Sequence, residues 1–306
     1  MEQTIKFDNE MKALAQAVYK ENEKFIPKDW IKFTEKDNKK TGFHAEAFYK
    51  NGKVVIAIKG SDFENKGNDW TKNNYNMYIK KLPNQYIDAQ DFYEEIKKDF
   101  PNREILFTGH SLGGSLAQLM GNKTGCETVT FNAYGVADFS DNKYSLNPTN
   151  IRNYGNINDT TFNLKIDSHL GKTYVIHENN ENGYWEKSKK DGYSGGTAPV
   201  GHHFIESMGS LEDASEYKPK TLYAAVSHDI DFKDIDDKRI FTREEIDEMT
   251  NEEYSRLENL INKQLRAGKI MAKSQAEEKL KSGDLIWVDD YTRSDGTHVR
   301  GYYRSR

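Results

Sequence analysis

Residues 105–117 read Ile-Leu-Phe-Thr-Gly-His-Ser-Leu-Gly-Gly-Ser-Leu-Ala, so a short apolar run meets the pattern Gly-x-Ser-x-Gly and then a segment with helical spacing. Such a run is typical of a buried strand, and Ser111 lies where that strand would turn into a helix. A serine on so tight a turn has a strained backbone, and side chains two residues to either side would collide. Gly109 and Gly113 avoid that collision. The pattern predicts that Ser111 is a nucleophile and that amides at the start of the helix bind an oxyanion. The alternative is a glycine-containing turn without a catalytic role.

The composition indicates a folded protein with a large polar surface. The chain has 306 residues, which is enough for one large domain or two modest ones. Charged residues make up 30%, and the formal net charge of −5 is spread over many Lys and Glu residues. This pattern gives no basic patch for nucleic acid, so we expect no nucleic-acid partner. The single cysteine, Cys126, excludes an internal disulfide framework.

The first 30 residues bear on where the protein acts. They are polar and amphipathic, without the apolar core of a secretory signal peptide. No apolar run in the sequence approaches the length of a membrane span. We therefore expect a cytoplasmic location in the producing cell, or export by a route that cleaves no signal peptide.

The order of the predicted elements is typical of an α/β fold. An Asn-Gly pair at residues 51–52 predicts a hairpin between the first two strands. Alternating strands and helices predict a mostly parallel sheet flanked by helices. Helices are expected at 9–21 and 86–99, and strands at 43–49, 53–59, 105–110, 127–132, 161–166 and 173–177.

The composition changes near residue 211, and we predict two domains, 1–210 and 211–306. The second is expected to be an accessory module, with a helix that begins after Thr242 and a β-hairpin tail over 284–306 whose turn is Asp295-Gly296. An aspartate cluster at 229–237 lacks the spacing of a calcium loop, so we interpret it as a linker. No metal and no cofactor are expected.

A serine nucleophile needs a base within hydrogen-bond reach, and the base needs a carboxylate that orients it. The acid should follow a strand that comes after the nucleophile and its helix. Several histidines follow Ser111 and are candidates for the base: His169, His177, His202, His203, His228 and His298.

Several motifs, in their order along the chain, resemble the class 3 lipases. This α/β-hydrolase family contains fungal triacylglycerol lipases and bacterial phospholipase A1-like proteins. The similar segments are Ala57-Ile58-Lys59-Gly60-Ser61, Asp69-Trp70, Gly109-His110-Ser111-Leu112-Gly113-Gly114, the acid motif Asn-Tyr-Gly-Asn-Ile-Asn-Asp at 153–159, and the histidine motif His-Phe-Ile-Glu-Ser-Met at 203–208. The likeness covers residues 11–209 and implies an α/β-hydrolase fold.

The resemblance also implies a role for each matching residue. Ser111 would be the nucleophile, Asp159 the orienting acid and His203 the base. The backbone amides of Leu112 and Ser61 would form the oxyanion hole, with Ser61 in a place where the family usually has Thr.

Some assignments keep an alternative. His202 competes with His203 for the base, and the register of the histidine motif favours His203. Asp167 competes with Asp159 for the acid, but it lies nearer a turn and comes second. His110 is expected to pack or to bond the backbone, and Asp69 with Trp70 to anchor a loop.

The function implied by the resemblance is a serine esterase that hydrolyses carboxylic esters of lipids through an acyl-enzyme on Ser111. A phospholipase A1-like activity comes ahead of a triglyceride lipase, with transient contact to a membrane surface. Loops at 62–78 and 178–201 are not distinctly apolar, so a carboxylesterase for soluble esters is the alternative enzyme. A further alternative is a non-enzymatic carrier with a hydrolase fold, associated with a phage or a secretion system. The lack of a signal peptide and the accessory module also suit a bacterial effector with a secretion-system or immunity partner.

Overall fold

The computed structural model describes residues 2–19, 23–61, 73–139, 148–164, 166–176, 203, 205–218, 238–249, 257, 260–261, 263–265, 267–292 and 298–306. The chain divides into two compact units. The first contains Met1–Lys72 and Gln85–Ala225, and the second contains Asn73–Asn84 and Val226–Arg306.

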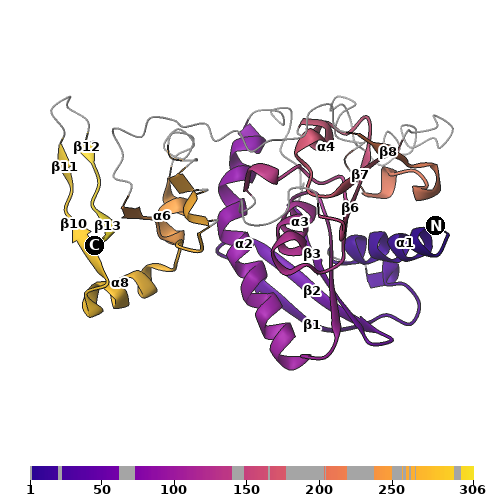
Figure 1. The fold of residues 1–306 in the computed structure, drawn as a ribbon, viewed down its shortest axis with the longest axis horizontal. Helices are drawn as coiled ribbons and strands as arrows, with labels where there is room; N and C mark the ends of the chain where they lie inside the picture. Colours follow the sequence, from indigo (N-terminus) through magenta and orange to yellow (C-terminus); the bar gives the residue numbers. More distant parts are fainter. Residues whose placement is uncertain are drawn as a thin grey trace. The chain divides into compact units, whose positions relative to one another are not determined.

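An eight-stranded sheet forms the centre of the first unit, and its strands lie side by side in sequence order (Figure 1). Strands β3 to β7 are parallel, whereas β1, β2 and β8 run antiparallel to their neighbours. This is the mostly parallel sheet that the sequence predicts. The strands are β1 (Ile31–Asn38), β2 (Phe43–Lys50), β3 (Lys53–Ile58), β4 (Glu104–His110), β5 (Thr128–Phe131), β6 (Ile151–Asn156), β7 (Lys172–Ile176) and β8 (Ser215–Tyr217).

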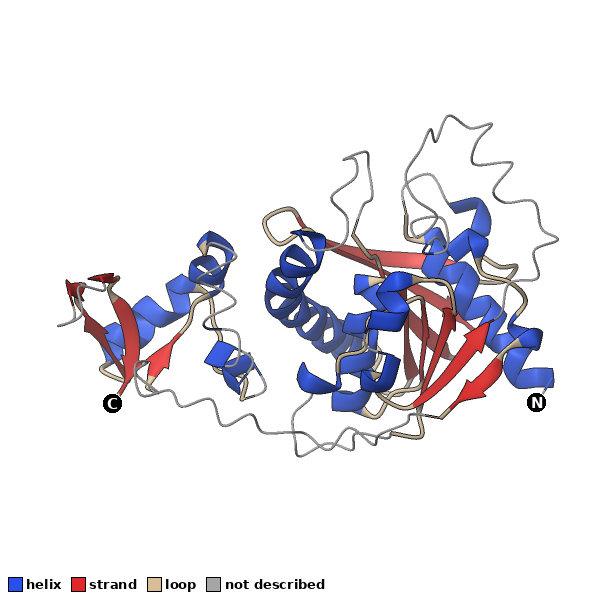
Figure 2. Ribbon diagram, turned by 90° about the horizontal axis from the view of Figure 1, so that it is seen from above, coloured by secondary structure: helices blue, strands red, loops and turns tan. Residues whose placement is uncertain are grey.

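Helices lie on both faces of this sheet (Figure 2). They are α1 (Glu2–Ala17), α2 (Asn73–Asp99), α3 (Leu112–Thr124) and α4 (Thr160–Leu164). On β4, Thr108 donates a hydrogen bond to a carbonyl of α1, whereas the ring of Phe107 contacts Tyr93 of α2. Adjacent residues of a strand point to opposite faces, so α1 and α2 cover opposite sides. The parallel strands follow one another across the sheet in sequence order, and connections between parallel strands are right-handed. The helices that connect these strands therefore lie on one face of the sheet. Helix α1 precedes the sheet in the chain and covers the other face.

The two predicted helices are confirmed, but both begin earlier than expected. On α1 the side chains of Met11, Leu14 and Ala15 are buried, and so is Val18 directly after the helix, which begins at Glu2 and ends at Ala17. On α2 the side chains of Ala89, Phe92, Tyr93 and Ile96 form a buried face. That helix begins at Asn73 and continues through Pro83, a residue that costs the helix one backbone bond without ending it.

The predicted strand at 161–166 is wrong. The chain there forms α4 and the short 3-10 helix η3 (Ile166–Ser168). The carboxylate of Asp159 accepts hydrogen bonds from the amides of Thr161 at 3.0 Å and Phe162 at 3.3 Å, which are among the first donors of α4. An aspartate that satisfies these donors favours a helix start, and β6 takes the place beside β5 instead.

The second unit contains helices and antiparallel strands, and the predicted domain boundary at residue 211 stays a prediction. Thr242 caps α6, because its Oγ1 accepts a hydrogen bond from the amide of Glu245 at 3.2 Å. β10 pairs with β13 and β11 with β12, which confirms a hairpin tail, although its predicted turn and the aspartate cluster at 229–237 lie outside the described residues. The elements are α6 (Arg243–Glu248), α8 (Lys273–Ser282), β9 (Arg239–Ile240), β10 (Leu285–Val288), β11 (Tyr291–Thr292), β12 (His298–Val299) and β13 (Tyr302–Ser305).

The remaining described elements are short 3-10 helices in the first unit: η1 (Glu23–Phe25), η2 (Ala137–Phe139), η6 (Ile205–Ser207) and η7 (Leu211–Asp213). Within the described ranges, no helix has both the length and the apolar composition that a membrane crossing requires.

Candidate active site

The predicted site residues come together at one edge of the sheet. β4 ends directly before Ser111, β3 leads to Ser61, and β6 leads to Asp159. Because these strands are parallel neighbours, their carboxyl ends lie at the same edge, where α/β proteins place their sites. His203 follows β7, the next parallel strand, and reaches the same group of residues.

The turn at Ser111 has the strained shape that its sequence pattern predicts. The backbone of Ser111 has φ 57° and ψ −128°, which lies outside the regions that residues with side chains usually adopt. A Cβ on Gly113 would come within 2.0 Å of the carbonyl oxygen of Ile58, and one on Gly109 within 2.5 Å of Gly113. Gly109 is therefore required for β4 to pack closely against the start of α3, and Gly113 for α3 to pack against the end of β3.

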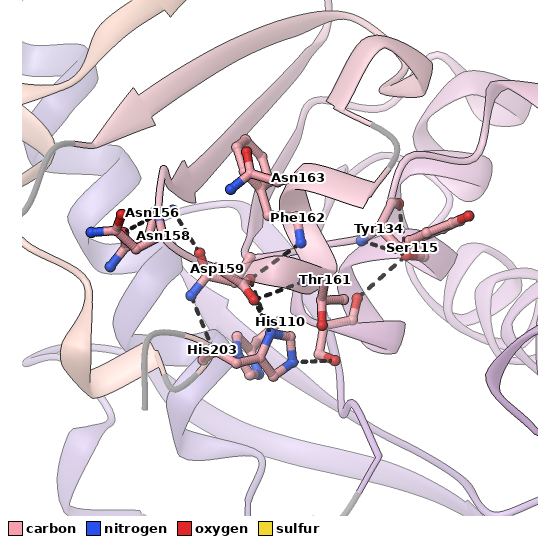
Figure 3. Close-up of polar contacts among 12 residues, drawn as sticks. His110, Ser115, Tyr134, Asn156, Asn158, Asp159, Thr161, Phe162, Asn163 and His203 are labelled. Atoms are coloured by element: carbon pink, nitrogen blue, oxygen red, sulfur yellow. Dashed lines mark hydrogen bonds and ion pairs between the residues drawn. The ribbon is translucent and has the colours of Figure 1, made fainter. Parts of the chain in front are cut away.

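Three side chains form a continuous hydrogen-bonded series. Nε2 of His203 lies 2.8 Å from Oγ of Ser111. Nδ1 of His203 lies 3.1 and 3.0 Å from the two carboxylate oxygens of Asp159 (Figure 3). The carboxylate oxygens of Asp159 accept hydrogen bonds, so Nδ1–H of His203 donates to them. Nε2 of His203 is then left to accept the proton of Ser111. The exposed fractions of Ser111, Asp159 and His203 are 2%, 1% and 1%, so bulk water is kept away from these groups. The arrangement can convert a serine hydroxyl into a nucleophile.

Of the alternative residues, the structure describes Asp167 and His169 in the first unit, and both have partners outside the series at Ser111. Asp167 is in η3 and accepts a hydrogen bond from the hydroxyl of Tyr217 at 2.9 Å. His169 is buried beside Gln118, with its Nδ1 3.3 Å from Oε1. The structure therefore joins Asp159 and His203 to Ser111. Of the other candidates, His177, His202, His228, Asp69 and Trp70 lie outside the described residues, and His298 belongs to the second unit.

Two asparagines that the sequence analysis missed connect the acid to the base. Oδ1 of Asn132 accepts the amide of Asn156 at 2.9 Å, and Oδ1 of Asn156 accepts the amide of Asn158 next to Asp159. Nδ2 of Asn132 donates to the carbonyl of His203 at 3.1 Å. Asn132 ends the predicted strand at 127–132 and has φ 44°, a conformation that asparagine tolerates better than most residues. The feature of the sequence that could have indicated Asn132 is its position at the end of a predicted strand.

The two predicted oxyanion donors lie beside the serine turn. Leu112 is the first residue of α3, where the helix supplies no acceptor for its amide. Ser61 follows Gly60, and a Cβ on Gly60 would be only 3.1 Å from Cβ of Ser111. The structure thus places both backbone segments next to Ser111, and the binding of an oxyanion by their amides stays a prediction.

Two buried histidines in this unit are held neutral. Burial, followed by the nearby His203, lowers the pKa of His110 to about 3. Burial also lowers the pKa of His169 to about 3. An unfolded histidine titrates near pH 6.5, so the unfolded chain binds more protons than the folded chain between pH 6.5 and 3. Acid therefore favours unfolding in that interval, and above pH 6.5 the effect disappears.

We expect the free energy of unfolding to fall by about 2 kcal/mol per buried histidine between pH 6.5 and 5. Urea denaturation at pH 7 and pH 5 measures this difference. The replacement His169→Gln removes one of the two groups and should reduce the loss between the two pH values by about 2 kcal/mol. An equal loss in the variant and the parent protein would contradict this explanation.

A second group of titratable side chains lies on β1 and β2. One ligand atom from each of Glu35, His44 and Glu46 lies within 4.8 Å of the others, a spacing that a metal ion could use. The ammonium of Lys32 already lies 2.6 Å from an oxygen of each glutamate and offsets part of their negative charge. We therefore interpret this cluster as a network of ion pairs on the sheet surface.

Comparisons with known proteins bear on the first unit. Residues 10–159 match the family described as Phospholipase-like: Tle-like phospholipase domain, a range that includes Ser111 and Asp159 but not His203. The extracellular phospholipase A1 of Serratia liquefaciens is 31% identical over 112 residues, 35% of this chain and 32% of that protein. A candidate lipase of Vanderwaltozyma polyspora, ATG15, is 42% identical over 57 residues, 19% of this chain and 10% of that protein. The chain thus spans between a tenth and a third of these two relatives.

Among solved structures, the triacylglyceride lipase of Rhizomucor miehei is 14% identical with a TM-score of 0.44. The alignment covers 69% of this chain and 97% of that lipase. The Lip2 lipase of Yarrowia lipolytica is 15% identical with a TM-score of 0.42, covering 57% of this chain and 81% of that lipase.

Proposed function

We propose that this chain is a serine esterase of the lipase and phospholipase family of α/β-hydrolases, and that it hydrolyses carboxylic esters of lipids. One observation carries the proposal: the hydrogen-bonded series from Ser111 through His203 to Asp159. A buried serine, imidazole and carboxylate in this order are the groups that acyl transfer requires. The strained turn at Ser111 supports the same role, because such strain is kept where it serves function.

In the first half of the proposed reaction, Oγ of Ser111 attacks the ester carbonyl carbon while Nε2 of His203 takes the hydroxyl proton. The carbonyl oxygen becomes an oxyanion, which the amides of Leu112 and Ser61 would stabilise. The carbon–oxygen bond to the alcohol part of the lipid then breaks, and that alcohol leaves with the proton from His203. The acyl chain remains as an ester on Ser111.

In the second half, water attacks the acyl-enzyme as His203 removes its proton. A second oxyanion forms and collapses, the fatty acid leaves, and the proton returns to Oγ of Ser111. Asp159 holds the imidazole in the required tautomer and stabilises its positive charge throughout.

Phospholipids are the substrate class that we propose first. The matching family is described as phospholipase-like, and a relative with 31% identity is a phospholipase A1. Transient contact with a membrane surface would follow from such a substrate. A secretion-system or immunity partner, and the location of the protein, stay predictions from the sequence.

The test incubates the purified full chain with vesicles of a phosphatidylcholine that carries different acyl chains at its two positions, and mass spectrometry identifies the products. We expect free fatty acid and lysophospholipid, and the identity of the acid assigns the position of cleavage. Matched vesicles of a dialkyl ether phospholipid contain no cleavable ester and should give no product. A triglyceride emulsion and p-nitrophenyl esters of graded length complete the comparison. Turnover of short soluble esters alone would favour the carboxylesterase, and no turnover at all would favour the non-enzymatic carrier.

A further inference from the structure

Two polar side chains next to the proposed triad have no part in the reaction above. Tyr19 follows α1, and His110 is the last residue of β4. The amide of Gly60 donates to Oη of Tyr19 at 3.2 Å, and that oxygen lies 2.8 Å from Nδ1 of His110. On the far side of the ring, Nε2 of His110 lies 2.7 Å from the carbonyl oxygen of His203. These contacts run from the loop of a proposed oxyanion donor to the backbone of the proposed base.

The chemistry of the groups fixes the direction of each bond. The carbonyl of His203 can only accept, so Nε2 of His110 must carry a proton and donate it. The amide of Gly60 can only donate, so Oη of Tyr19 accepts there. Because burial lowers the pKa of His110 to about 3, the ring is neutral and its Nδ1 accepts the hydroxyl proton of Tyr19. The result is one directed series, from Gly60 through Tyr19 and His110 to His203.

The backbone around this series is closely packed. A Cβ on Gly60 would lie 2.6 Å from both the hydroxyl of Tyr19 and the carbonyl oxygen of His110. The rings of His110 and His203 have their centroids 4.9 Å apart (Figure 3). A shift of Tyr19 or His110 would therefore displace Gly60, and with it the adjacent amide of Ser61.

Helix α1 also contacts the segment that follows His203. Nζ of Lys12 donates to the carbonyl of Met208 at 3.1 Å, and Nε2 of Gln16 donates to Oε1 of Glu206 at 3.1 Å. Both contacts bind α1 to the residues that follow His203. Tyr19, at the end of α1, is thus held at a constant distance from the segment that contains the proposed base.

We propose that Tyr19 and His110 are positioning residues, which keep the proposed oxyanion donor at Ser61 in a fixed place relative to the base His203. The inference rests on the proposed function, because it assigns these residues to that reaction. A displacement of about 1 Å in reacting groups can reduce the rate on the order of 100-fold. The oxyanion donor at Ser61 and the base His203 must therefore keep a fixed position relative to each other.

The main test is Tyr19→Phe, which removes one oxygen and leaves the ring. Both the amide of Gly60 and Nδ1 of His110 lose their partner. We expect kcat for phospholipid hydrolysis to fall roughly 10- to 100-fold, with KM changed less than about 2-fold, because the lost contacts affect the transition state more than substrate binding. Tyr217→Phe is the matched control: it removes a hydroxyl that bonds Asp167 instead, and it should keep full activity. Thermal denaturation of each variant shows whether a change in kcat reflects unfolding.

A second variant tests whether Tyr19 acts through His110. The side-chain amide of His110→Gln can donate to the carbonyl of His203 but cannot reproduce the bond to Tyr19. If Tyr19 acts through His110, adding Tyr19→Phe to the His110→Gln protein should lower kcat by less than about 3-fold, and not by the full factor that it has in the parent protein. Equal effects of Tyr19→Phe in both backgrounds would overturn the linkage, and so would a Tyr19→Phe protein with the kcat of the parent. If the parent protein itself hydrolyses no ester, the proposed function fails, and this inference fails with it.

Discussion

Replacement of Ser111 by alanine is expected to lower the hydrolysis of phospholipid on the order of 10⁴-fold or more. The hydroxyl that attacks the ester is then absent, and Nε2 of His203, now 2.8 Å from Oγ, has no proton to receive. Alanine keeps the Cβ of serine, so the backbone at φ 57° carries the same strain and the turn should keep its shape. Fatty-acid release under steady-state conditions measures the loss.

Ser115→Ala is the control for this variant. Ser115 lies one turn further along α3, is also buried, and donates its hydroxyl to the carbonyl of Tyr134 at 2.9 Å. It should cost about 1 kcal/mol of stability and leave kcat within a few-fold of the parent value. A Ser111→Ala protein with more than a tenth of the parent activity would exclude Ser111 as the nucleophile.

The second large effect is expected from Asp159→Asn, which should lower kcat on the order of 10⁴-fold. An asparagine presents an N–H to the imidazole, so the ring of His203 turns to the tautomer that carries its proton on Nε2. That nitrogen can then no longer accept the proton of Ser111. The amide oxygen of asparagine can still accept a hydrogen bond from the start of α4, so the loss should be one of kcat and not of folding.

Asp167→Asn separates the two acids that the sequence left in competition. Asp167 accepts the hydroxyl of Tyr217, and an asparagine oxygen can do the same, so this variant should keep the parent kcat. Parallel measurement of kcat and of the thermal midpoint for both variants decides between them. A large loss in Asp167→Asn with a normal Asp159→Asn protein would reverse the assignment of the acid.

The serine turn could be predicted from the sequence because the pattern of two glycines around a serine is local. A Cβ on Gly109 would meet backbone atoms of Gly113, whereas a Cβ on Gly113 would meet Ile58 at the end of β3, a contact that the local pattern does not reveal. The acid and the base depend on distant parts of the chain. Residues alone left several histidines open, and only the resemblance to a family favoured Asp159 and His203. The order of the parallel strands then brings them to the same edge of the sheet.

Other features were not predictable from local patterns. The segment at 161–166 has residues that suit a strand or a helix, and the carboxylate of Asp159 decides for the helix. Tyr19 falls within the helix predicted at 9–21, and that helical pattern carries no information on the partners of its hydroxyl. The partners of its hydroxyl, Gly60 and His110, come from the ends of two strands that α1 meets only after the sheet has formed.

Covalent trapping of the nucleophile tests directly whether Ser111 is the reactive serine. The purified chain is incubated with a fluorophosphonate, and peptide mass mapping locates the adduct. We expect one adduct per chain on Ser111, formed rapidly in the parent protein and at less than about 1% of that rate in Asp159→Asn. An adduct on another residue, or continued ester hydrolysis by a protein in which Ser111 stays unmodified, would contradict this assignment.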